Sequence, residues 1–228
     1  MLFIYLHDIN SYMLTSSTNV VSLKGIPLTS FKVKGSSSFY EVYKVTKKDK
    51  NFLQDMYNSI DLTKLMPNMH QWDYINWDGI LKEAIGKSMQ DDRITYLETY
   101  NDKPCGIMNF STMQEGFYLN FISTFPTERK KRVPCGGQIL FNKLFKDFIK
   151  TGSLFIGLCA LKFAPFNPIS IYSKLGFKPT TEDDCMVDME ISKKSVEEAL
   201  SKQSEFLSAT EITDGKDIDL GNVINLNL

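Results

Sequence analysis

Residues 118–140 read YLNFISTFPTERKKRVPCGGQIL, and residues 171–177 read IYSKLGF. The first stretch passes from a β-type sequence through a basic, glycine-containing loop into a segment with apolar residues at helical spacing. Between the two stretches, residues 154–161 (LFIGLCAL) are almost continuously apolar, which is typical of a strand buried on both faces. This order of strand, loop, helix, buried strand and short helix decides the fold, and the other segments are interpreted around it.

The loop before the helix combines several features that suit an anion. Backbone N–H groups at a helix start have no intrahelical partner and lie at the positive end of the helix dipole, so they readily bind phosphate. Gly136 and Gly137 let the backbone approach such a group closely, and residues 129–132 (RKKR) add positive charge just before them. Each feature alone is common in solvated loops, but together they predict a diphosphate site.

These stretches resemble the core of the GNAT superfamily (GCN5-related N-acetyltransferases). The family's loop has the form Arg/Gln-x-x-Gly-x-Gly/Ala at a helix start, and residues 132–137 (RVPCGG) follow it in part. A later family signature, Tyr-x-Lys-x-Gly-Phe, matches residues 172–177 (YSKLGF). The resemblance implies an α+β fold, namely a GNAT-like three-layer α/β/α arrangement with a mixed, mostly antiparallel twisted sheet and splayed central strands.

The resemblance also implies a function, which is that of an acyl-CoA-dependent N-acyltransferase moving an acetyl group from acetyl-CoA directly to an amine. The acceptor, a small molecule, peptide or protein, is not identified by the sequence. The acyl-CoA would enter where the strands at residues 117–125 and 154–161 separate. The implied cofactor-binding residues lie on the first of these strands, in the loop, at the helix start and before the short helix: Ile122, Ser123, Thr124, Arg129, Arg132, Val133, Cys135, Gly136, Gly137, Gln138 and Asn167.

Two catalytic roles need residues. By resemblance, Tyr172 is the acid that protonates the leaving CoA thiolate, since a phenol with a pKa of about 10 can donate to it. The alternative is a tyrosine that only packs in the core. The acceptor ammonium must also lose a proton, and Glu115, just before the central strand, is the first candidate for this base. Glu115 is alternatively a simple turn residue, and Glu98 and His70 are further candidates.

Three features depart from the family pattern. Cys135 stands where the family has glycine, and a side chain there costs about 1 kcal/mol if the backbone requires a positive φ. The segment from Pro126 to Gly137 is longer than the usual loop, and Asn167 lies closer to Tyr172 than the family's CoA-contacting asparagine does. These departures leave a second hypothesis open, which is a catalytically inactive GNAT-fold binding or regulatory module.

The composition argues against several other classes. The chain has 228 residues, of which 43% are hydrophobic and 23% charged, and its formal net charge of −1 does not favour nucleic acid or an anionic membrane as a partner. With one short basic run, a nucleic-acid binder is the weakest hypothesis. Four scattered cysteines and two histidines predict no metal site. No signal peptide or transmembrane segment is recognised, which predicts a cytoplasmic protein.

The sequence divides into three predicted parts. Residues 1–38 form an N-terminal appendage, residues 39–192 the GNAT-like acyltransferase domain, and residues 193–228 a C-terminal helix to residue 207 and a polar tail. The tail is expected to be loosely held or to contact another chain, with a homodimer as one option. Within the domain, strands are predicted at residues 39–45, 94–100, 106–110, 117–125, 154–161, 177–178 and 186–191, and helices at residues 51–59, 74–89, 139–149 and 169–175.

Overall fold

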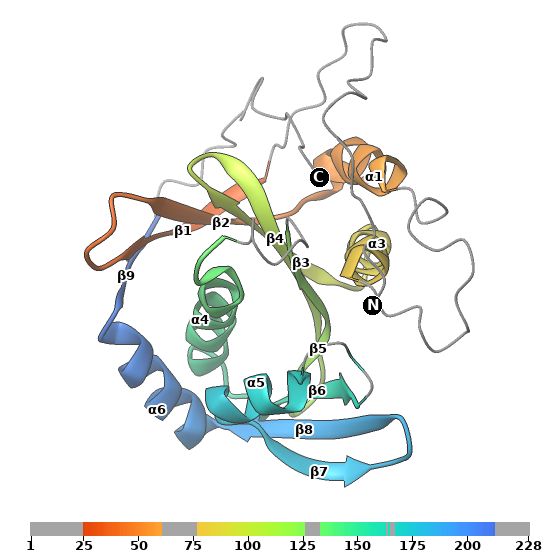
Figure 1. Cartoon of the computed structure of the whole chain (residues 1–228), viewed down its shortest axis with the longest axis vertical. Coiled ribbons are helices and arrows are strands. Elements are labelled where there is room, and N and C mark those ends of the chain that lie inside the picture. The colour runs from red at the N-terminus through yellow and green to blue at the C-terminus, as the bar shows by residue number, and fades with distance from the viewer. Residues whose placement is uncertain (1–24, 61–76, 126–132, 163, 165–166, 213–228) are drawn as a thin grey trace, which may run out of the picture.

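The structure is a computed structural model, and it describes residues 25–60, 77–125, 133–162, 164 and 167–212 (Figure 1). In these residues, one nine-stranded sheet has the strand order β7-β8-β6-β5-β4-β3-β2-β1-β9. Its strands are β1 (Ile26–Val33), β2 (Phe39–Lys44), β3 (Ile94–Tyr100), β4 (Lys103–Thr112), β5 (Gly116–Thr124), β6 (Phe155–Leu161), β7 (Lys178–Glu182), β8 (Met186–Ser192) and β9 (Leu207–Glu211). The helices are α1 (Lys50–Ser59), α3 (Trp77–Ser88), α4 (Gly136–Ile149), α5 (Pro168–Leu175) and α6 (Lys193–Ser204), and a 3-10 turn, η2, precedes α1 at Lys47–Asp49.

The sheet is mixed but mostly antiparallel. Every pair of neighbouring strands runs antiparallel except β5 and β6, which run parallel. Helix α4 forms the crossover between these two, since parallel neighbours need a long connection. Tight turns connect antiparallel neighbours. Between β3 and β4, Asn101 and Asp102 adopt positive φ angles of 47° and 65°, the geometry that two-residue hairpin turns prefer.

Helices cover both faces of the sheet, so the chain forms three layers (Figure 1). On one face, α1 and α3 pack together, and their buried side chains form one apolar cluster with residues of β2, β3 and β4. On the other face, α4 lies along the sheet with α5 and α6 beside it. Helix α4 buries the apolar residues that recur at helical spacing: Ile139, Leu140, Leu144, Phe145 and Phe148. The predicted three-layer α+β fold is therefore confirmed.

The two central strands separate partway along their length. Strands β5 and β6 pair over only four positions, from Gly116 to Leu119 of β5, although both strands continue past this point. A β-bulge lies at the same place, because the pairing of β5 with β4 shifts between Asn109 and Phe110 and leaves Asn120 as an extra residue. Bulges bend and twist the strand that carries them. The splayed central strands predicted from the sequence are confirmed.

Side chains hold the bulge in place. The Asn120 amide oxygen accepts a hydrogen bond from Arg93 at 2.8 Å, and its nitrogen donates to the Ser111 hydroxyl at 3.0 Å. Arg93 also donates to Ser111. These bonds connect β5 to β4 and to the residue just before β3, so the place where β5 leaves β6 is fixed by side chains as well as by the backbone.

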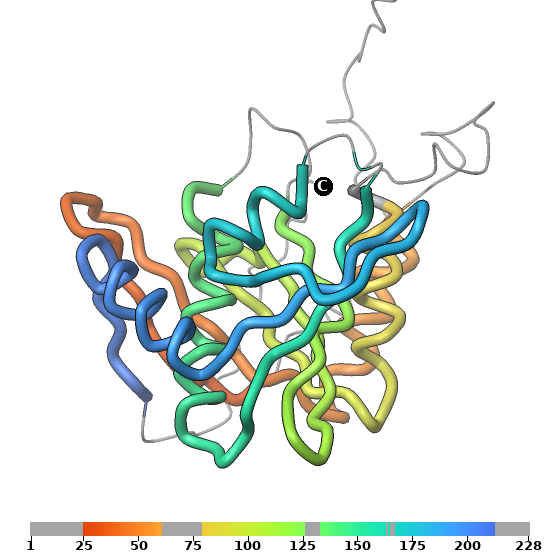
Figure 2. Tube along the Cα trace, turned by 90° about the horizontal axis from the view of Figure 1, so that it is seen from below, coloured from red at the N-terminus to blue at the C-terminus, as the bar shows by residue number. Residues whose placement is uncertain are grey.

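The strands at one end of the sheet come from both ends of the described chain. Strand β1 pairs with β2 on one side and with β9 on the other, and Figure 2 shows β9 beside the β1–β2 hairpin. Residues 208–211 belong to β9, so the prediction that they are loosely held is wrong. The last helix ends at Ser204 rather than at residue 207. The three-part division of the chain stays a prediction.

A buried cation ties β9 to α4. The Lys143 side chain is only 3% exposed, and its Nζ lies 2.7 Å from Asp147 of the same helix and 3.5 Å from Glu211 of β9. Tyr96 of β3 donates a hydrogen bond to the same Asp147 carboxylate. Because a buried charge is costly unless it is paired, this arrangement links α4, β3 and β9 into one unit.

We expect Lys143→Met to lower the free energy of unfolding by about 2 kcal/mol, which is less than the loss for a fully buried pair because both carboxylates still reach solvent. Chemical denaturation measures the change. The matched control is Lys150→Met, because Lys150 lies 3.8 Å from Asp147 and 3.7 Å from Glu211 but is 61% exposed. Its effect is expected to stay within about 0.5 kcal/mol. Equal losses for the two variants would contradict the role of burial.

Candidate functional site

The N-terminus of α4 presents backbone donors that the helix itself does not use. The helix starts at Gly136, and the Ile139 N–H bonds to the Cys135 carbonyl at 3.0 Å. No side-chain hydrogen bond from Cys135 caps this end, and the N–H groups of Gly136, Gly137 and Gln138 have no helical partner. Donors of this kind, at the positive end of the helix dipole, suit a phosphate group.

Cys135 precedes the helix in a left-handed conformation, with φ 62° and ψ 0°. The positive φ considered from the sequence is therefore present, and it costs a non-glycine residue about 1 kcal/mol. The side chain is half-buried and packs against the apolar core. Burial, and then the nearby Glu98, raise the pKa of the thiol. The residue is strained, but its side chain does not bring a negative charge to the helix start.

The two glycines of the helix start have different surroundings. Among the described residues, a Cβ on Gly137 would meet only the Thr124 side chain, at 4.0 Å, so these residues leave room on this side of the turn. A Cβ on Gly136 would lie 3.4 Å from side-chain atoms of both Glu98 and Thr124. Gly136 therefore faces the sheet, and it brings the start of α4 against the end of β5.

Tyr40 of β2 fixes the backbone that leads into α4. Its hydroxyl donates a hydrogen bond to the Pro134 carbonyl at 2.5 Å, and its ring packs against Tyr100 with 4.9 Å between ring centroids. Burial raises the pKa of this hydroxyl, so it remains a donor. The sequence predicted the strand but not this contact, because Tyr40 and Pro134 are far apart along the chain.

Beyond Leu119, one edge of β5 has no strand partner among the residues that the structure describes. The strand keeps its ladder to β4, but its pairing with β6 has ended. Ile122, Ser123 and Thr124 lie in this part, and their backbone groups on the β6 side are available to an extended ligand. The Ser123 hydroxyl is buried and has no hydrogen-bond partner among the described residues. The predicted contact strand therefore has the required free edge.

Tyr172 lies on α5, on the same face of the sheet as α4. Its ring packs against Phe141 of α4 and against Phe177, with 6.0 Å between ring centroids in both pairs. Burial, and then the nearby Cys159 of β6, raise the pKa of its hydroxyl to about 12. The hydroxyl thus stays protonated at neutral pH. Cys159 is the first residue of β6 after its pairing with β5 ends, so Tyr172 lies near the point of separation.

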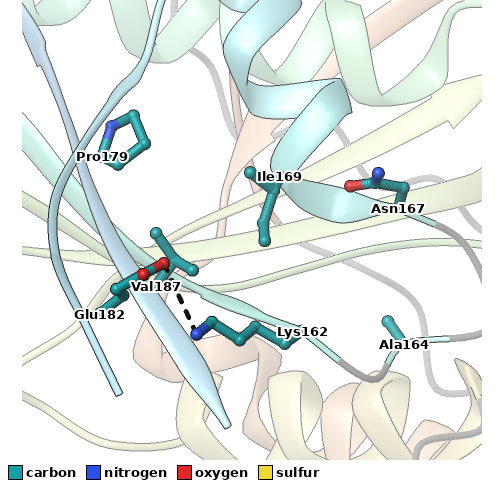
Figure 3. Close-up of a pocket in the computed structure, with 7 residues that line it drawn as sticks. All are labelled: Lys162, Ala164, Asn167, Ile169, Pro179, Glu182 and Val187. Atoms are coloured by element: carbon teal, nitrogen blue, oxygen red, sulfur yellow. Dashed lines mark ion pairs between the residues drawn. The ribbon is translucent and has the colours of Figure 1, made fainter. Parts of the chain in front are cut away.

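Asn167 forms the N-cap of α5, where its side chain accepts a hydrogen bond from the Ser170 N–H at 2.9 Å. It also lines a cavity of about 460 Å³ beside the end of β6 (Figure 3). Lys162 and Glu182 form an ion pair at 3.5 Å in the wall of this cavity. None of the described residues that line it belongs to β5, so the cavity is distinct from the separation of β5 and β6.

Two of the three predicted bases, Glu115 and Glu98, lie in the described part of the chain, and they occupy different places in the fold. Glu115 is exposed in the turn before β5, at the end where β5 and β6 are paired. The length of β5, roughly 25 Å of extended chain, separates it from Thr124. Glu98 is completely buried on the α4 face beside Gly136. The remaining predicted residues lie outside the described part of the chain: His70, Arg129 and Arg132.

Sequence analysis missed a polar group on the face of the sheet opposite α4. The Tyr118 ring lies over Gly157, and the next residue of β6 on this face is Cys159, which pairs directly with Asp188 of β8. Burial and Asp188 raise the pKa of the Cys159 thiol to about 11, and Thr181 donates to Asp188 at 2.8 Å. Strand β8 alternates exposed and buried residues, a signal that places Asp188 on its open face.

Comparison with known proteins identifies the fold. No family model matches the sequence, and no curated protein matches it either. Among solved structures, apo FdhC, described as a nucleotide-linked sugar GNAT, matches 74% of this chain and 95% of its own with a TM-score of 0.53 and 13% sequence identity. The PaiA N-acetyltransferase from Thermoplasma acidophilum in complex with coenzyme A matches 67% of this chain and 98% of its own, with a TM-score of 0.48 and 19% identity.

A third structure, the ribosomal-protein-S18-alanine N-acetyltransferase from Escherichia coli, matches 67% of this chain and 93% of its own, with a TM-score of 0.47 and 16% identity. The likeness to FdhC, together with the splayed parallel pair, shows that this chain has the GNAT fold. Within the described residues, no helix is long and apolar enough to cross a membrane. The same residues contain no group of three or more His, Cys, Asp or Glu side chains placed to hold a metal ion.

The strain at Cys135 gives a prediction about stability. We expect Cys135→Gly to be more stable than Cys135→Ala by about 1 kcal/mol, because both variants lose the thiol but only glycine adopts the left-handed conformation without strain. Chemical denaturation of the two variants measures this difference. An alanine variant as stable as the glycine variant would show that the backbone at this position is not held at positive φ.

Proposed function

We propose that this protein is an acyl-CoA-dependent N-acyltransferase that transfers an acetyl group from acetyl-CoA to an amine. One observation carries the proposal: in the described part of the chain, the start of α4, which the Cys135 side chain does not cap, meets the edge of β5 that β6 no longer pairs, and Thr124 lies against Gly136 there. The start of α4 suits a diphosphate, and the edge of β5 suits an extended arm with amide groups. These are the two parts that adjoin in a CoA molecule, so the pair fits acyl-CoA better than a free phosphate.

Each predicted contact residue has a role in this proposal. The N–H groups of Gly136, Gly137 and Gln138 hold the diphosphate, and the positive charges of Arg129 and Arg132 assist them. The preceding residues, Val133 and Cys135, shape the turn. The backbone of residues 122–124 binds the pantetheine arm. Asn167, whose oxygen caps α5, offers its amide nitrogen to the ligand.

Tyr172 assists departure of the CoA thiolate. The acceptor nitrogen attacks the thioester carbonyl carbon, a C–N bond forms and the C–S bond breaks, so negative charge develops on sulfur. The Tyr172 hydroxyl, which its environment keeps protonated, donates a hydrogen bond to this sulfur. Of the two protons that an ammonium acceptor loses, the one removed before attack passes through the base to solvent, and the one lost from nitrogen as the C–N bond forms completes the free CoA thiol.

The acceptor approaches from the face of the sheet that α4 does not cover. Asp188 lies on this face opposite Cys159, next to the start of the separation between β5 and β6. An exposed carboxylate attracts an ammonium group and accepts a proton from it, which allows the neutral amine to attack. We therefore assign the role of base to Asp188 rather than to Glu115.

Binding of acetyl-CoA tests the proposal directly. A ligand at 100 times its Kd stabilises the folded state by about 2.7 kcal/mol, so saturating acetyl-CoA should raise Tm by several degrees. Gly137→Asp should abolish the rise, because a carboxylate in the first turn suits the helix but blocks an anion. Gly152→Asp is the matched control, since Gly152 lies in open space beyond the other end of α4. No rise in the native protein with any acyl-CoA would contradict the proposal.

We expect Tyr172→Phe to lower kcat by about 10²-fold or more with little change in acyl-CoA affinity, because only the donor to sulfur is lost. Release of the CoA thiol in the presence of amines measures turnover. The panel includes nucleotide-linked amino sugars, since FdhC is described as a nucleotide-linked sugar GNAT. Tyr57→Phe on α1 is the control. Unchanged turnover in Tyr172→Phe would remove this tyrosine from the chemistry.

The strained Cys135 favours one alternative, which is a GNAT-fold module that binds a ligand without catalysis. That alternative predicts no thiol release with any amine, although acetyl-CoA could still stabilise the protein.

A further inference from the structure

Glu98 of β3 lies beneath the start of α4. Its side chain is completely buried, with 0% exposure, and neither carboxylate oxygen has a hydrogen-bond partner of normal geometry among the described residues. A Cβ on Gly136 would lie 3.4 Å from one of these oxygens and 3.5 Å from the other. The carboxyl group therefore points at the first turn of α4 from the side of the sheet, while a ligand would approach the same turn from outside.

The surrounding backbone provides the space that this carboxyl group occupies. Gly106 of β4 pairs directly with Glu98, and a Cβ there would lie 2.6 Å from a Glu98 oxygen, so the carboxyl group would have to move from its present position. The register of β3 and β4 also shifts between Glu98 and Thr99. Gly106, Gly136 and the register shift together leave room for the buried Glu98 side chain, so the local backbone accommodates this acid.

Among the described residues, the groups that face the carboxyl group are weak acids rather than cations. They are Tyr40 of β2, Cys105 of β4 and Cys135 at the start of α4, and burial raises the pKa of each, with a further increase from Glu98. Burial also raises the pKa of Glu98 well above its ordinary value, and the neighbouring Cys105 opposes this only in part. None of the described groups that shift it is a cation. Burial therefore favours the protonated, neutral form of the Glu98 carboxyl group.

The charge of Glu98 and the charge of a bound diphosphate act on the same helical turn. An ionised Glu98 would occupy the positive end of the α4 dipole and repel a second anion there. A protonated Glu98 leaves the dipole and the free N–H groups available to the ligand. An ionised Glu98 and a bound diphosphate therefore repel each other, and each weakens the other.

We propose that Glu98 is a positioning residue that couples acyl-CoA binding to proton uptake, because the diphosphate binds at α4 only when the Glu98 carboxyl group carries its proton. The inference rests on the function proposed above, since it takes the ligand at α4 to be the CoA diphosphate. Binding that favours the protonated acid raises its pKa further. Affinity is then independent of pH below the pKa of the free protein's Glu98, and above it affinity falls by up to about tenfold per pH unit.

Calorimetric titration with S-methyl-CoA tests this coupling. S-methyl-CoA is a thioether, so it has no thiol that titrates. The phosphate monoester on its ribose loses its second proton at about pH 6. Titrations from about pH 7.5 to about pH 10 therefore report on ionisable groups of the protein. Kd is measured across this range, and two buffers of different ionisation enthalpy give the number of protons taken up. Glu98→Gln keeps the shape and removes the charge, so its affinity should stay flat where that of the native protein falls.

Glu41→Gln is the matched control. Glu41 lies on the neighbouring strand β2 and bonds to Tyr43 on the face opposite Tyr40, so this variant should keep the native dependence on pH. If Kd changes with pH equally in the native protein and in Glu98→Gln, the proposal is overturned, while the acyl-CoA function stays intact. If Glu98→Gln does not fold, proton uptake by the native protein decides, and no uptake at alkaline pH overturns it. A native protein that binds no CoA compound at any pH refutes the proposed function and this inference with it.

Discussion

The backbone ladder between β5 and β6 ends at Leu119 and Leu158, and the proposed chemistry depends on this ending. A parallel ladder that continued to Thr124 would satisfy every backbone group and leave no edge for a ligand. The separation is tolerated because each strand keeps its ladder on the other side, β5 with β4 and β6 with β8. It is also localised, because the Asn120 bulge and its bonds determine where β5 turns away.

Topology then places the start of α4, the proposed diphosphate site, beside the free edge of β5. Helix α4 connects two neighbouring parallel strands, so its N-terminus follows the carboxyl end of β5, which is the end where the strands part. Ligands bind sheets at such positions in many α/β proteins. Strands β2 and β3 also contribute to this site from the sheet. Tyr40 of β2 donates a hydrogen bond to the Pro134 carbonyl, and the Glu98 side chain of β3 lies against Gly136. Residues from distant parts of the sequence thus determine the shape of one turn.

This distance along the chain also explains which features the sequence could predict. Helix α4 and strand β6 follow from local apolar patterns, and the Tyr172 segment follows from its signature. Strand β9 (LSATE) is short and polar, and it exists only through its pairing with β1, so no local pattern reveals it. Alternation placed Glu98 on a strand but did not say which face it occupies. Glu115 was expected near the chemistry because it adjoins β5, yet the strands part at the other end.

The two faces at the point of separation differ in the charge they accept. On the α4 face, burial raises the pKa values of Tyr40, Cys135, Glu98 and Tyr172 and so favours their neutral forms. An anionic ligand there meets a helix dipole and neutral donors instead of like charges. On the opposite face, the exposed Asp188 attracts a cation. An anionic acyl donor and a cationic amine would therefore be drawn to opposite sides of the same strand edge, which is the arrangement that direct transfer between them requires.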